Sequence, residues 1–136
     1  MRSDENLSYD GNEKLVKLKE TVVRDYFNKL AQGDLDNLLK MFAEDASVHE
    51  PFSKWKTLNG RAEIKSFLKV VVMANKGMHQ ELVIEKGDEE TTENQITATV
   101  TFRKGSSIKC RFVFELNRCQ DLAKGVIESL GITLID

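Results

Sequence analysis

One glutamate in this sequence has the spacing of a buried proton acceptor. Glu50 follows Val48 by two residues and directly precedes Pro51, the only proline of the chain. Residues two apart in a strand point to the same face, so the Glu50 carboxylate is partly desolvated if that face looks into the core. Desolvation disfavours the charged form of a carboxyl group and brings it toward proton transfer near neutral pH. The alternative is a solvated glutamate at a strand end that carries no chemistry.

Tyr26 is the second candidate, because it lies within a pattern of apolar residues at three- and four-residue steps. Val22 and Leu30 flank it, each four residues away, which predicts a helix with the tyrosine ring on its buried face. In a cavity, the Tyr26 hydroxyl would donate a hydrogen bond to a developing oxyanion. In a solid core, the same hydroxyl would be satisfied by a protein partner.

Two histidines complete the set of side chains with catalytic or metal-binding chemistry. His49 is next to Glu50 but on the opposite strand face, and His79 opens a later strand near Glu81. These residues lack the short ligand spacing that is typical of zinc sites. The sequence also lacks the motifs for dinucleotides, phosphates, protease zinc and calcium loops. We therefore expect no metal and no cofactor.

The composition argues against several classes of function. The 136 residues carry 20 Lys and Arg against 22 Asp and Glu, for a net charge of −2, whereas nucleic-acid binding favours a basic surface. No apolar run approaches the roughly 20 residues of a membrane helix, and no apolar signal segment is visible at the polar start. The cysteines, Cys110 and Cys119, are too few for a disulfide framework. We expect a cytoplasmic protein that binds neither nucleic acid nor membranes.

The candidate residues must be positioned by a domain that begins with helices and ends with strands. We expect a flexible lead-in over 1–12 and a single domain over 13–136. Apolar spacing predicts helices between Asn12 and Gly33, from Asp34 to Phe42, and from Arg61 to Asn75. Alternating apolar and polar residues predict strands over 46–51, 80–85, 96–103, 108–116 and 124–134, with a loop over 52–59 and a turn over 87–90. The pattern indicates an α+β fold with helices on the apolar face of an antiparallel sheet.

One stretch of the chain is similar to a known family. Residues 22–51 read VVRDYFNKLAQGDLDNLLKMFAEDASVHEP, which resembles the opening of ketosteroid isomerases and of polyketide-cyclase-like (SnoaL-like) proteins. Gly60-Arg61 and Ile64 extend the likeness. These proteins belong to the nuclear transport factor 2-like superfamily, with a cystatin-like fold. The resemblance implies a cone-shaped, curved and mostly antiparallel sheet wrapped around three helices, with a deep apolar pocket.

The resemblance also implies roles for the two candidate residues. Glu50 falls where the isomerases carry the aspartate that moves the proton, and Tyr26 falls on the tyrosine that hydrogen-bonds the enolate oxygen. The sequence departs from the isomerases at Phe112, which aligns with their second oxyanion donor. A phenylalanine cannot donate there, and losing one such donor typically costs a factor of about 10²–10³ in rate. Glutamate in place of aspartate also moves the carboxylate by about the length of one methylene.

The resemblance leads us to expect a small apolar ligand and a function in proton transfer, as an isomerase or cyclase acting on an apolar carbonyl compound. The alternative is a non-catalytic ligand-binding or dimerisation module of the same fold. The Asp-Arg-Asp set of the epoxide hydrolases that share this fold is not found in the sequence. The expected substrate-binding residues are Phe27, Leu30, Phe42, Val48, Phe52, Trp55, Phe67, Val71, Phe102, Phe112 and Phe114.

The outer face of the sheet suggests a partner. Threonines at 97, 99 and 101 alternate with apolar residues, and Lys109 and Arg111 alternate with Cys110 and Phe112. This fold commonly pairs sheet to sheet, and a β-branched face of mixed charge suits an isologous contact. We therefore expect a homodimer through the outer face of the sheet.

Overall fold

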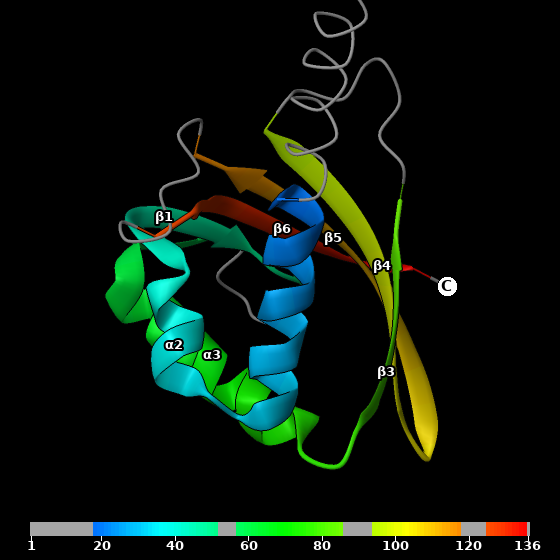
Figure 1. Cartoon of the computed structure of the whole chain (residues 1–136). Coiled ribbons are helices and arrows are strands. Elements are labelled where there is room, and N and C mark those ends of the chain that lie inside the picture. The colour runs from blue at the N-terminus through cyan, green and yellow to red at the C-terminus, as the bar shows by residue number, and fades with distance from the viewer. Residues whose placement is uncertain (1–17, 52–56, 86–93, 118–124, 136) are drawn as a thin grey trace, which may run out of the picture.

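Three helices lie on one side of a curved, six-stranded sheet in the computed structural model of the chain (Figure 1). The structure describes residues 18–51, 57–85, 94–117 and 125–135. The expected lead-in over 1–12, the start of the first helix and the turn over 87–90 lie outside these ranges. The α+β class and the three-helix arrangement predicted from the sequence are confirmed.

The first two helices are joined by a tight turn that the sequence predicts. The first helix covers residues 18–32, and Gly33 ends it with a φ of 72°, a conformation that favours glycine. The backbone N–H of Asp34 then donates to the carbonyl of Lys29 at 3.0 Å. Asp34 caps the next helix, α2 (Leu35–Lys40), and hydrogen bonds from Asn37 lower the pKa of the Asp34 carboxyl. The turn brings α2 back alongside the first helix (Figure 1).

The region after α2 differs from the prediction at Phe42. The sequence places Phe42 in the second helix, because it continues the apolar spacing, but the structure begins β1 there (Phe42–His49). A further strand, β2 (Thr57–Asn59), lies within the predicted loop and pairs antiparallel with β1. Helix α3 follows over Gly60–Asn75. The guanidinium of Arg61 donates two hydrogen bonds to the carbonyl of Phe42, at 2.8 and 3.0 Å, and fixes the start of α3 against β1.

The second half of the chain forms the large antiparallel part of the sheet. Its strands are β3 (His79–Ile84), β4 (Gln95–Lys104), β5 (Ser106–Leu116) and β6 (Ile127–Ile135). The strand order is β2-β1-β6-β5-β4-β3, and only the β1–β6 pair is parallel. The pairing register shifts between β1 and β6 and between β5 and β6, and such irregularities let a sheet bend.

The core lies between the helices and the concave face of the sheet. Alternate residues of β4 and β5 are buried, as the period of two predicts. Gly125 precedes β6 with a φ of 83°, and a Cβ there would overlap the carbonyl oxygen of Phe42. This close approach seats β6 beside β1. No helix in the described ranges is long and apolar enough to cross a bilayer.

Candidate functional site

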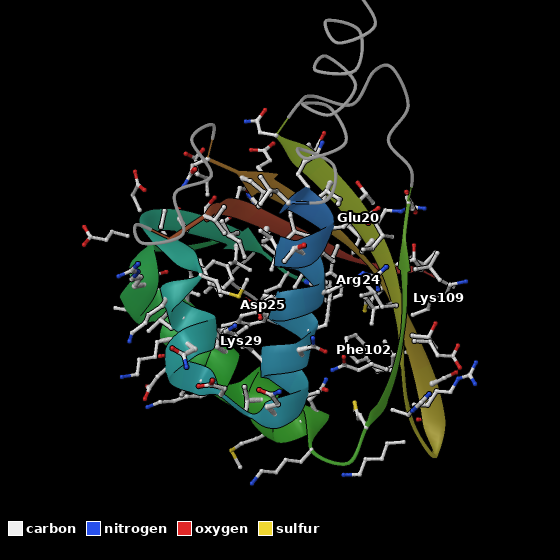
Figure 2. The ribbon with its side chains drawn as sticks, in the orientation of Figure 1. Glu20, Arg24, Asp25, Lys29, Phe102 and Lys109 are labelled. Atoms are coloured by element: carbon white, nitrogen blue, oxygen red, sulfur yellow. The ribbon has the colours of Figure 1, made fainter. Side chains whose placement is uncertain are left out.

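A cavity of about 590 Å³ lies between α3 and the concave face of the sheet. Its walls are almost entirely apolar. Helix α3 contributes Glu63, Ser66, Phe67, Val70, Val71, Ala74 and Asn75. The sheet contributes Leu58, Phe102, Ile108, Cys110, Phe112 and Ile132, and the remaining wall residues are Tyr26, Leu30, Glu50 and Met78. Figure 2 shows Phe102 on the helix side of β4, whereas Lys109 of β5 lies on the outer side of the sheet.

Glu50 brings a carboxylate into this apolar wall. It directly follows β1, and its side chain is only 5% exposed. Val48 is also buried while His49 between them is exposed, so the alternation expected from the sequence holds through the end of the strand. The Glu50 carboxylate thus lies in the cavity wall, where a bound molecule can meet it.

Tyr26 lines the same cavity from the first helix. Its ring is 1% exposed and makes edge-to-face contacts with Phe27, Phe42 and Phe114 at centroid distances of 5.0–6.1 Å. Such contacts fix the ring in one orientation. Burial raises the pKa of Tyr26, so the phenol keeps its proton. Among the described residues, no hydrogen bond to the Tyr26 hydroxyl is formed, which leaves it as a donor for a bound molecule.

The structure divides the predicted wall residues into three groups. Leu30, Phe67, Val71, Phe102 and Phe112 line the cavity. In contrast, Phe27, Phe42, Val48 and Phe114 are buried in the packed core and do not line it, because neighbouring aromatic and aliphatic side chains fill the space around them. Phe52 and Trp55 lie outside the described residues.

Sequence reasoning missed most of the residues that α3 places in the wall. It named Phe67 and Val71 of this helix, which do line the cavity, but not the other α3 wall residues, Glu63, Ser66, Val70, Ala74 and Asn75. On β5, Ile108 and Cys110 share the face of Phe112 by alternation, so the strand pattern could have identified them. Burial raises the pKa of the Cys110 thiol, which therefore stays protonated.

A second carboxylate, Glu63, lies in the wall but is exposed. Its Oε1 accepts a hydrogen bond from the backbone N–H of Asn59 at 3.3 Å, just before the start of α3. This contact satisfies the backbone N–H of the N-cap residue, as the glutamate of a capping box does, but from one residue farther along the helix. Glu63 thus serves the helix start, and its solvated carboxylate differs from the buried one of Glu50.

The two histidines do not form a common site. His49 lies on β1, where its Nδ1 is 3.0 Å from the hydroxyl of Thr57, and His79 starts β3, which is separated from β1 by three strands. Within the described ranges, no three His, Cys, Asp or Glu side chains come together as a metal site would require.

The family of the chain follows from comparison with known sequences. Residues 23–122 match the SnoaL-like domain family, so the chain belongs to this family, as its opening helices and Glu50-Pro51 predicted. None of the curated protein sequences matches it.

Solved structures share the fold. SalBIII, an epoxide hydrolase/cyclase-like enzyme in pyran ring formation in the polyether salinomycin, is 21% identical with a TM-score of 0.68, over 86% of this chain and 90% of SalBIII. A SnoaL-like protein from Burkholderia thailandensis is 13% identical with a TM-score of 0.70, over 88% and 97% of the two chains. A putative polyketide cyclase from Xanthomonas campestris is 19% identical with a TM-score of 0.61, over 85% and 89%. At these identities the likeness shows the fold.

Proposed function

We propose that this SnoaL-like protein binds a small, mainly apolar carbonyl compound in its cavity and moves a proton on it, as an isomerase or a cyclase. The observation that carries the proposal is the meeting of two groups in one apolar cavity. Glu50 is a buried carboxylate, and Tyr26 is a buried phenol with a free donor among the described residues. The two roles are complementary. Removal of a proton by Glu50 from the carbon next to a carbonyl group creates negative charge on the carbonyl oxygen, and the Tyr26 hydroxyl stabilises this charge by donating a hydrogen bond.

In the proposed reaction, Glu50 takes a proton from the carbon next to the carbonyl group. The electrons of the broken C–H bond form a carbon–carbon double bond, and the carbonyl oxygen becomes an enolate. Tyr26 donates its hydrogen bond to this oxygen, and its raised pKa keeps the proton on the phenol. In an isomerase, Glu50 then returns the proton to another carbon. In a cyclase, the enolate carbon attacks a second carbonyl carbon of the same molecule. The π electrons of that C=O bond move to its oxygen, which takes the proton from Glu50 and becomes a hydroxyl group.

The descriptions of two structural neighbours favour ring closure as the class of reaction. SalBIII is described as a cyclase-like enzyme that acts in pyran ring formation, and the Xanthomonas protein as a putative polyketide cyclase. An elongated substrate that folds on itself needs a roomy apolar cavity, and about 590 Å³ is within the usual range for small-molecule sites.

A second candidate function is ligand binding without turnover. Phe112 favours it, because this residue lies in the cavity wall where a second oxyanion donor would strengthen catalysis. A phenylalanine adds apolar contact and no hydrogen bond. A measurement of proton transfer on a bound ketone distinguishes the catalytic function from ligand binding alone.

Exchange of deuterium from solvent into a bound methyl ketone tests the proposal without knowledge of the natural substrate. We expect the protein to accelerate exchange next to the carbonyl of 2-dodecanone in D₂O, followed by proton NMR. Glu50→Gln should lower the protein-dependent rate by about 10²-fold or more, and Tyr26→Phe by about 10–10²-fold.

The matched control is Glu115→Gln, an exposed glutamate on the outer face of β5, which should leave the rate unchanged. A rate for Glu50→Gln within a few-fold of the native protein would show that Glu50 is not the base. Binding of 2-dodecanone with no acceleration of exchange would favour the non-catalytic function.

We also propose that the protein forms a homodimer through the outer face of the sheet. On this face lie Thr97, Thr99, Thr101, Lys109 and Arg111, together with the exposed Val83 of β3. Sedimentation at micromolar concentration should give twice the chain mass, and Thr99→Lys should lower that mass toward the monomer. A native monomer under these conditions would contradict the dimer.

A further inference from the structure

We infer that Asn75 is a second hydrogen-bonding anchor in the cavity, and that the ligand carries a second oxygen, an acceptor, on the β3 side of the molecule. The inference rests on the proposed ligand-binding function and specifies the class of ligand. It assigns to Asn75 a role in specificity and orientation, apart from the proton transfer at Glu50.

Burial distinguishes Asn75 from the other polar residues. Within the described ranges, only two residues of polar or charged type are buried, Glu50 and Asn75, with exposures of 5% and 7%. Both line the same cavity. A buried amide is costly unless its donors and acceptors find partners, so the partners of Asn75 decide what it is able to bind.

The two ends of the Asn75 amide differ in how well they are satisfied. Its Oδ1 accepts a hydrogen bond of 2.6 Å from Nε2 of Gln80 on β3. This short contact fixes the orientation of the amide group. The Nδ2 atom has two N–H donors, and its protein contact is the sulfur of Met78 at 4.0 Å, a weak acceptor. In the part of the chain that the structure describes, Nδ2 therefore has donor capacity left for an oxygen in the cavity.

Asn75 and Glu50 line the same cavity, on one face of the sheet, but lie next to strands that are far apart in the strand order. Gln80, which holds Asn75, lies on β3, and Glu50 directly follows β1. The strand order β1-β6-β5-β4-β3 puts four inter-strand spacings between them, about 19 Å measured along the sheet. The curvature of the sheet shortens the direct path. A ligand that reaches both groups is elongated, with an apolar middle against Phe112 and Phe102 and an oxygen toward each side.

The chemistry of the walls defines the ligand class. Nδ2 of Asn75 and the Tyr26 hydroxyl are donors, so both oxygens must act as acceptors: two carbonyls, or a carbonyl and an ether or hydroxyl oxygen. A chain with a carbonyl at one end and a second oxygen farther along fits this description. The contrasting account is that Asn75 and Gln80 only tie the end of α3 to β3.

Matched ligands separate the two accounts. The ligands are linear methyl ketones and the corresponding diketones of ten, twelve and fourteen carbons, for example 2-dodecanone and 2,11-dodecanedione. At each length, the diketone has one more carbonyl group, on the second-last carbon of the chain. Calorimetry gives the ratio of the ketone Kd to the diketone Kd for each length. For at least one length, we expect this ratio to fall about five-fold in Asn75→Leu, the size of one lost hydrogen bond, while the Kd of the ketone stays within about two-fold.

Two further variants complete the test. Gln80→Met keeps Asn75 but removes the group that orients it, so the ratio should fall by a smaller factor. The control is Thr133→Ala, an exposed residue on the outer face of β6 away from the cavity, and it should leave the ratio unchanged. A ratio that stays constant in both Asn75→Leu and Gln80→Met at all three lengths would overturn the assignment of Asn75.

The result is distinguishable from failure of the proposed function. Tyr26→Phe should weaken binding of ketone and diketone alike. If Tyr26→Phe and Glu50→Gln change neither binding nor exchange while Asn75→Leu lowers the ratio, the proton-transfer function fails and the Asn75 anchor stands. If the Glu50 and Tyr26 variants behave as predicted and the ratio does not change, only the anchor fails.

Discussion

Phe112 and Phe114 lie two residues apart on the same face of β5, yet they belong to different regions of the molecule. Phe114 is fully buried in the packed core, where its ring meets Tyr26 at 5.4 Å. Phe112 is also buried, but its ring forms part of the cavity wall. Farther toward the start of the strand, Ile108 lines the cavity and is 43% exposed. Along this face of β5, three regions follow one another: a filled region around Phe114, a hollow region at Phe112, where the ring borders the cavity, and an open rim at Ile108.

The difference shows what makes the cavity. The side chains that face the helices are apolar all along β5, so residue type does not separate the two regions. The separation comes from what lies opposite. Phe114 packs against Tyr26 and Phe27 of the first helix, whereas Phe112 packs against Phe27 and also faces the space between α3 and the sheet. The polar groups Glu50 and Asn75 are buried only where that space exists.

Truncation in the filled region should have the largest effect. We expect Phe114→Ala to lower the free energy of unfolding by about 3–5 kcal/mol, because it removes a fully buried ring and leaves a new void. Urea unfolding followed by circular dichroism measures the loss. A loss below about 1 kcal/mol would mean that this part of the core is not tightly packed.

Filling the hollow region should change binding with little effect on stability. Val71→Phe adds a ring to the α3 wall of the cavity, so it should weaken binding of 2-dodecanone by more than about ten-fold while the free energy of unfolding changes by less than about 1 kcal/mol. Titration calorimetry and urea unfolding give the two values. Strong destabilisation with unchanged binding would show that the space is not available to ligands.

Tyr26 lies at the boundary between the filled and hollow regions and should make the free energy of unfolding sensitive to alkaline pH. Burial raises the pKa of its phenol in the folded state above the unfolded value, so its contribution to stability is complete below about pH 10 and is lost as pH rises further. The native protein should lose up to about 1.4 kcal/mol per pH unit more than Tyr26→Phe above pH 10. Equal pH slopes for the two proteins would contradict the burial of the phenol.

The open rim should give the smallest effect. Ile108→Ala removes a partly exposed side chain, so we expect a loss of stability of about 1 kcal/mol or less and a decrease in the affinity for 2-dodecanone of about two- to five-fold. Thr133→Ala, on the outer face of β6, is the control and should change neither quantity. A loss of stability close to that of Phe114→Ala would place Ile108 in the core.

The fold was predictable because local patterns and the family resemblance agree. The spacing around Tyr26, the Gly33-Asp34 turn and the alternation of Val48 with Glu50 each predict what the structure shows. Phe42 was misplaced because its spacing from Leu38 and Leu39 continues a helical pattern, although the chain enters β1 there. The strand β2 was missed because three residues, Thr57–Asn59, are too few to show a period.

The walls of the cavity were predictable only in part. Phe27 and Phe114 have the same residue type and facing as Phe67 and Phe112, and only the packing of α3 and the first helix decides which of them line a space. Asn75 gave no signal, because an asparagine at the end of a helix is ordinary in sequence. Its burial and its contact with Gln80 depend on how α3 meets β3.

A crystal structure of the protein with 2-dodecanone tests the central claim most directly. The ketone should lie in the cavity between α3 and Phe112, with its carbonyl oxygen about 2.6–3.2 Å from the Tyr26 hydroxyl and the adjacent carbon facing the Glu50 carboxylate. A ketone bound in the cavity with its oxygen away from Tyr26, or bound only outside the cavity, would contradict the assignment of Glu50 and Tyr26 as the site of proton transfer.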